Sequence, residues 1–147
     1  IYVNGSVFIE PRLKNINDID NAIITLELSN GVLCTIDSSR QTHFGYDQRI
    51  EVFGSEGMMS IKNKKNNLYS LSDKKHTRTS KIKESFIERY ENSYLDQLKH
   101  FYTCIINKSK PSVNPKNILD AIQVAAAGNE SLKINEPVMV KRWKWLT

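Results

Sequence analysis

The sequence predicts an α+β domain, in which an open, mostly antiparallel β-sheet carries two main helices on one face and uses its other face for assembly. Two observations support this prediction. Residues 1–83 contain short β-rich runs separated by turn residues, whereas residues 86–134 contain apolar residues spaced every three to four positions. No internal repeat or linker divides the 147 residues, so we expect residues 1–147 to form a single domain with one core.

The first three β-rich runs cover residues 2–9, 22–29 and 32–41. Asn30 and Gly31 separate the second run from the third, and this pair is a strong signal for a two-residue hairpin loop. A tight loop would place Leu26 on the same face as Leu33, with Cys34 on the opposite face. A longer, bulged loop would change this register.

Two further strands are expected at residues 48–54 and 58–62, around a turn at residues 54–57, and two weaker polar strands at 67–71 and 77–83. The apolar period changes at Phe86 and predicts an amphipathic helix of about six turns over residues 86–107. A second helix begins with Asn114 as its cap and Pro115 as its first residue, although Gly128 interrupts it.

Residues 137–140 are expected to form a closing strand. The tail beyond them contains Trp143 and Trp145, which suggests a contact with another domain or subunit. A partly exposed tail is an equally good interpretation.

The net charge of +5 is concentrated in residues 62–83, where eight basic residues and one acid give a local charge of +7. A phosphate-binding surface for nucleic acid is one interpretation of this basic segment. A solvated hairpin at the edge of a sheet is the other, and we favour it because Tyr69 is the only aromatic residue available there for base stacking. We therefore do not expect nucleic acid as a partner. We do not expect a membrane either, because no apolar run reaches the roughly 20 residues that span a bilayer.

Cys34 and Cys104 lie far apart in the sequence and have no metal-ligand spacing, so we expect both to be reduced and buried in a cytoplasmic protein. The three histidines are scattered, and no metal site is predicted. The sequence contains no glycine-rich dinucleotide motif and no self-contained catalytic constellation, so we predict no catalytic and no cofactor-binding residue in this chain.

The densest polar cluster covers residues 37–49 and includes Arg40, Tyr46 and Asp47. Its donors and acceptors suit a polyhydroxylated ligand, and the ring of Tyr46 could lie on a sugar-like face. A structural interpretation is equally good, in which Arg40 and Arg49 pair with Asp37 and Asp47 across neighbouring strands.

Several strings resemble the C-terminal domain of the Gfo/Idh/MocA oxidoreductases, and most of all their inositol dehydrogenase branch. They are DIDNA at residues 18–22, SRQ at 39–41, GYDQRIEVFGSEGM at 45–58 and FIERY at 86–90. The resemblance covers residues 2–140, and the string from Ser39 to Arg49 is its most specific part. The basic segment and Gly128 depart from the family pattern.

The resemblance implies an enzyme with an N-terminal Rossmann domain that binds NAD and is absent from this chain. In such enzymes a Lys, an Asp and a His act around the hydride transfer, and all three would lie before residue 1. This chain would supply one wall of the pocket for a cyclitol or sugar, together with the face for a homodimer or homotetramer. Tyr46 is the best candidate for a substrate contact, and Asp47 and Arg40 are weaker candidates.

Two hypotheses remain open from the sequence. The chain is either part of an NAD-dependent dehydrogenase and inactive by itself, or a free-standing, non-catalytic binding or assembly module. Because it begins at Ile1 rather than Met, we expect a fragment.

Overall fold

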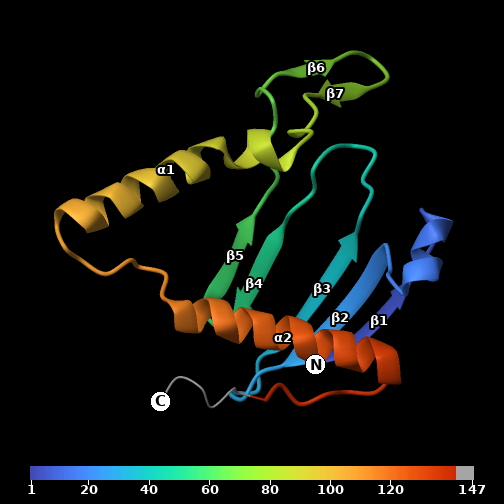
Figure 1. Cartoon of the computed structure of the whole chain (residues 1–147). Helices are drawn as coiled ribbons and strands as arrows, with labels where there is room; N and C mark the ends of the chain where they lie inside the picture. The colour runs from blue at the N-terminus through green and yellow to red at the C-terminus, as the bar shows by residue number, and fades with distance from the viewer. Residues whose placement is uncertain (142–147) are drawn as a thin grey trace. The chain divides into compact units, whose positions relative to one another are not determined.

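The computed structural model describes residues 1–141 and confirms the α+β class, with antiparallel strands followed by two long helices (Figure 1). The strands form three small sheets, in the orders β1-β2-β3, β4-β5 and β6-β7. The chain divides into two compact units. The first unit comprises Ile1–Gln41 with Lys110–Thr147, and the second unit comprises Thr42–Ser109.

The first unit contains a three-stranded sheet of β1 (Tyr2–Ser6), β2 (Asn21–Glu27) and β3 (Leu33–Ser39), with a 3-10 helix (Pro11–Ile16) between β1 and β2. The loop between β2 and β3 is longer than two residues, because the Leu28 N–H donates to the Val32 carbonyl at 2.9 Å. Gly31 sits within it at φ +83°. Leu26 consequently pairs with Cys34. The register of the tight loop is therefore wrong, and the bulged alternative is correct.

Helix α2 (Pro115–Ile134) packs on β1 of the first unit (Figure 1). Asn114 accepts a hydrogen bond from the Asn117 backbone N–H and confirms the predicted cap. Gly128 lies where the helix approaches the strand, and a Cβ there would come within 3.3 Å of the Val3 side chain. The departure at Gly128 therefore has a packing reason.

The outer edge of β1 forms hydrogen bonds with residues near the C-terminal end of the described chain. Ser131 of α2 is fully buried, accepts the Val3 N–H at 3.0 Å and donates to the Glu136 carbonyl at 2.7 Å. The predicted closing strand at residues 137–140 is wrong as an element, but Val138 and Ile1 exchange two backbone hydrogen bonds of 2.8 Å. The predicted contact of Trp143 and Trp145 lies outside the described residues.

Strand β1 ends earlier than predicted because Asp20 draws the following residues away from the ladder. Its carboxylate accepts the backbone N–H groups of Phe8, Ile9 and Glu10 at 2.7–2.9 Å, while its residue is only 3% exposed. Burial by itself would raise the pKa of Asp20. The hydrogen bonds from these three amides and from the Asn21 side chain outweigh it and lower the pKa from 3.8 to about 2.

The second unit contains two hairpins and helix α1. Strands β4 (Ile50–Gly54) and β5 (Gly57–Ile61) are joined by the predicted two-residue turn. Strands β6 (Ser70–Ser72) and β7 (Thr77–Thr79) confirm the polar hairpin of the basic segment, with shorter strands than predicted. Helix α1 (Phe86–Ile106) confirms the amphipathic prediction, and Ser85 caps it by accepting the Glu88 N–H at 3.2 Å.

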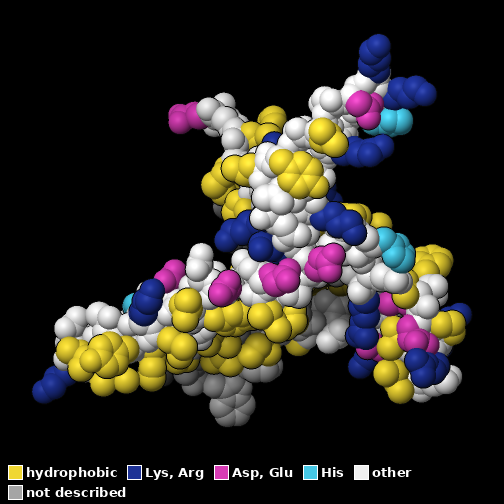
Figure 2. All heavy atoms as spheres, turned by 90° about the horizontal axis from the view of Figure 1, so that it is seen from above, with side chains coloured by type: hydrophobic (Ala, Val, Ile, Leu, Met, Phe, Trp, Pro, Cys, Tyr) yellow, Lys and Arg dark blue, Asp and Glu magenta, His cyan; other side chains and the backbone are white. Residues whose placement is uncertain are grey.

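Few apolar residues are buried. Within residues 1–141 they are Val3, Leu13, Cys104 and Ala127. Figure 2 shows hydrophobic side chains exposed over much of the face that it presents. Cys104 is buried as expected, but the prediction for Cys34 is wrong, since this thiol is exposed on β3. An exposed apolar surface of this extent is typical of a chain that other protein covers.

Replacing Asp20 with Asn should make the free energy of unfolding vary less with pH in the acid range. The folded-state pKa lies below the unfolded value, so this carboxylate stabilises the native state fully above about pH 4, and the stabilisation is lost as the pH falls towards 2. We expect urea unfolding between pH 2 and pH 6 to show a gap between wild type and D20N that widens as the pH rises.

The matched control for D20N is Asp37→Asn, which alters an exposed carboxylate on β3 of the same sheet. Its unfolding curve should follow the wild type across the whole pH range. Equal behaviour of D20N and D37N would contradict the role assigned to Asp20.

Candidate functional site

The candidate site is built around the Tyr46 loop, defined here as residues 42–49 of the second unit, which leads into β4. The backbone N–H of Tyr46 donates to the Lys83 carbonyl at 2.8 Å. Its ring packs edge-on against Tyr90 with centroids 6.2 Å apart, and against Phe86 at 6.3 Å. Within the described residues its hydroxyl has no hydrogen-bond partner. The loop therefore holds an aromatic ring firmly and leaves a polar group available.

Gly45 allows the chain to pass close to Ile82 and Lys83, which precede α1. Its φ of +125° lies in the region that favours glycine. A Cβ at this position would come within 2.5 Å of the Ile82 side chain and 2.9 Å of the Lys83 carbonyl oxygen. The Lys83 N–H in turn donates to the Lys64 carbonyl at 2.9 Å. Ile82 and Lys83, at the end of the basic segment, thus lie against the Tyr46 loop.

Asp47 is already engaged by neighbouring side chains. The Arg49 guanidinium donates to both carboxylate oxygens, at 2.8 and 2.9 Å, and the Asn63 amide donates to one of them. These hydrogen bonds hold the pKa of Asp47 below its ordinary value, so the group is ionised at neutral pH. This arrangement suits a residue that fixes the loop better than one that contacts a ligand.

Arg40 belongs to the first unit, where it follows β3. Its guanidinium forms an ion pair of 2.6 Å with Asp18, and both side chains are substantially exposed. An exposed pair of this kind contributes little to stability. The structural interpretation of the polar cluster names the correct partner for Arg49, but this pair with Asp47 is local rather than across strands. It is wrong for Arg40, which pairs with Asp18 rather than Asp37.

Sequence reasoning missed Arg89, Asn63 and Tyr90 as parts of this site. Arg89 and Tyr90 lie in the first turn of α1, and Asn63 follows β5. Arg89 is buried and donates to the Asn63 side chain at 2.9 Å. The sequence contained one signal for Arg89, because it is three residues after the apolar Phe86 and therefore lies on the same face of the helix.

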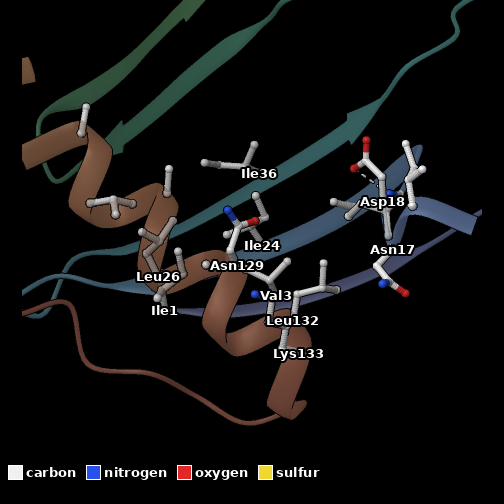
Figure 3. Close-up of a pocket in the computed structure, with 17 residues that line it drawn as sticks. Ile1, Val3, Asn17, Asp18, Ile24, Leu26, Ile36, Asn129, Leu132 and Lys133 are labelled. Carbon is white, nitrogen blue, oxygen red and sulfur yellow. Dashed lines mark hydrogen bonds between the residues drawn. The ribbon is translucent and has the colours of Figure 1, made fainter. Parts of the chain in front are cut away.

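A separate cavity of about 700 Å³ lies in the first unit between α2 and the sheet (Figure 3). Val3, Ile24, Leu26, Ile36 and Leu132 line it, and the polar Asn17, Asp18, Asn129 and Lys133 also border it. None of the predicted contact residues Arg40, Tyr46 and Asp47 borders this cavity. The Tyr46 loop therefore remains the better candidate for the predicted ligand.

Within residues 1–141, no group of three or more His, Cys, Asp or Glu side chains is placed to hold a metal ion. No helix in the described part of the chain is long and apolar enough to cross a membrane. The turn at residues 54–57 joins two strands, so it lacks the helix N-terminus that a phosphate-binding loop requires.

Comparison with known proteins gives a match to a family model over residues 4–140. That model describes the C-terminal alpha/beta domain of an oxidoreductase family. A myo-inositol 2-dehydrogenase from Thermotoga maritima is 33% identical over 96% of this chain and 42% of its own length. A scyllo-inositol 2-dehydrogenase (NAD(+)) from Bacillus subtilis is 26% identical over 93% of the chain and 40% of its own length.

The fold matches solved structures equally well. The crystal structure of a myo-inositol dehydrogenase from Corynebacterium glutamicum superimposes with a TM-score of 0.88 and 30% identity, covering 97% of this chain and 43% of that one. The chain thus spans about two fifths of the length of the relatives that it matches.

Replacing Gly45 with Ala should destabilise the second unit by about 2–5 kcal/mol, because it combines backbone strain with a steric clash against residues 82 and 83. Gly31→Ala is the matched control, since Gly31 also has a positive φ but a Cβ there meets nothing within 4 Å. G31A should cost only the strain, about 1–2 kcal/mol. Chemical denaturation of both variants measures the difference, and equal losses would refute the clash.

Proposed function

The chain belongs to the C-terminal alpha/beta domain of the Gfo/Idh/MocA oxidoreductase family, and we propose that it is part of an NAD-dependent dehydrogenase that oxidises a hydroxyl of a cyclitol or related sugar. The resemblance noted in the sequence is thereby confirmed at the level of the family. In this proposal residues 1–147 form one substrate and assembly domain of a cytoplasmic enzyme. The names of the relatives support inositol-like substrates, since they include a myo- and a scyllo-inositol dehydrogenase.

The observation that carries the proposal is the arrangement of Tyr46. Its ring is held by Phe86 and Tyr90, and its hydroxyl has no protein partner among the described residues. A phenol can donate and accept a hydrogen bond, so it suits a substrate hydroxyl. We assign Tyr46 the substrate contact and Asp47 the role of fixing the loop, while Arg40 stays a weaker candidate.

The residues of this chain do not fit a dinucleotide. The sequence has no GxGxxG motif, and the Gly54 to Gly57 turn connects strands rather than a strand and a helix. We therefore propose that NAD binds to an N-terminal Rossmann domain outside residues 1–147. The name of the Bacillus relative, which specifies NAD(+), supports this choice of cofactor.

We further propose that the exposed apolar surface is covered by this N-terminal domain and by further copies of the protein. The sheet face opposite α2 carries Ile23 and Leu33, which are 62% and 77% exposed. Leaving such side chains in water costs roughly 1.5–3 kcal/mol each relative to burial. A homodimer or homotetramer through this face would remove that cost.

The proposed activity is tested with the full-length protein that contains this chain. We expect it to reduce NAD in the presence of at least one inositol isomer, and we expect residues 1–147 alone to be inactive. Absorbance at the nicotinamide band, across a panel of cyclitols and sugars, measures both. Failure of the full-length protein with every compound would overturn the proposal.

Replacing Tyr46 with Phe in the full-length protein should lower kcat/KM for the polyol about 10-fold, because one hydrogen bond of roughly 1.4 kcal/mol is lost while the ring contacts remain. The KM for NAD should not change. Tyr69→Phe, which alters an exposed tyrosine of the basic segment, is the matched control and should behave as wild type. A Y46F enzyme with wild-type kinetics would remove Tyr46 from the site.

A further inference from the structure

Arg89 is an arginine that the fold has taken almost completely out of water. It lies in the first turn of α1 and is only 6% exposed. Within residues 1–141 no carboxylate forms an ion pair with it, although its charge helps to lower the pKa of Asp47. A buried guanidinium needs its hydrogen bonds, because nothing else replaces the hydration it has lost. Its acceptors are therefore held in fixed positions.

The guanidinium joins two segments that are distant in sequence. One terminal nitrogen donates to the Gln48 carbonyl at 2.7 Å, and the other donates to the Asn63 side-chain oxygen at 2.9 Å. The planar fork of arginine presents these two donors at a fixed angle, which a lysine cannot do. Arg89 thus sets the distance between the end of the Tyr46 loop and Asn63, the second residue after β5.

Asn63 passes this constraint on to the loop. Its side-chain oxygen also accepts the Gln48 backbone N–H at 2.9 Å, and its amide nitrogen donates to Asp47. The next residue of α1 acts in the same direction, because the Tyr90 hydroxyl donates to the Gln48 side chain. Three consecutive residues, Tyr46 to Gln48, are consequently held from the first turn of one helix.

We infer that Arg89 is a positioning residue, which holds the Tyr46 hydroxyl where it contacts the polyol. This inference rests on the proposed function. Arg89 touches no substrate itself and acts through Asn63 and Gln48 on the loop. A displacement of about 1 Å at a contact group is enough to lower the rate substantially, so loss of the fork should affect the substrate and not NAD.

The test is a double-mutant cycle in the full-length protein with wild type, Y46F, Arg89→Gln and the combined variant. We expect R89Q to lower kcat/KM for the active cyclitol at least about 10-fold, with the KM for NAD changed less than about twofold. In the R89Q background, Y46F should lower kcat/KM by less than about twofold, because the hydroxyl has already lost its position. Arg78→Gln, which alters an arginine of β7, is the matched control and should have no effect.

Arg89→Lys repeats the cycle with a variant that keeps the charge and loses the fork, in case R89Q does not fold. If Arg89 had only a structural role, its replacement would lower stability, and the effects of the two substitutions on kcat/KM would be additive. That result would overturn the inference, and an active wild-type enzyme would still support the proposed function. A wild-type protein that turns over no cyclitol or sugar would overturn both together.

Discussion

Backbone groups at the ends and edges of a strand ladder must find partners, and in this chain buried or half-buried polar side chains supply them. Asp20 takes the amides that follow β1. Ser131 takes the Val3 amide at the sheet edge. Arg89 and Asn63 take the polar groups of Gln48 where the Tyr46 loop enters β4. Each of these side chains binds one irregular segment to regular structure, and the candidate site is one such segment.

This dependence on polar side chains goes together with the small number of buried apolar residues. Val3, Leu13, Cys104 and Ala127 cannot by themselves order the exposed hairpins around them. Hydrogen bonds fix the geometry of the loops, and burial against other protein would supply the remaining free energy. Because hydrogen bonds fix the Tyr46 loop, the phenol of Tyr46 can be well ordered even though much of the surrounding surface is exposed and apolar.

The features that the sequence predicted are those determined locally. The cap at Asn114 and the apolar period of α1 need only neighbouring residues, and both helices were found at their expected positions. The loop after β2 was harder, because Asn30 and Gly31 fit both two- and three-residue loops, and the register depends on which of these loops forms. Gly128, Cys34 and Arg89 depend on what lies across from them in space. A sequence shows an arginine in a helix, but it does not show that the helix face closes over it.

Under the proposed function, the Tyr46 loop alone would not determine which cyclitol the enzyme accepts. A single phenol donates and accepts, so it contacts an axial or an equatorial hydroxyl equally well. Discrimination between epimers of a cyclitol requires several polar groups fixed around the ring, since a site rejects a wrong isomer only when a buried partner is left without its hydrogen bond. Asp47 has little capacity for a second such contact, because Arg49 and Asn63 already take three of the roughly four acceptor positions of its carboxylate. In the proposed enzyme Tyr46 would be the fixed contact from this loop, and the choice among inositols would require further polar groups around the ring.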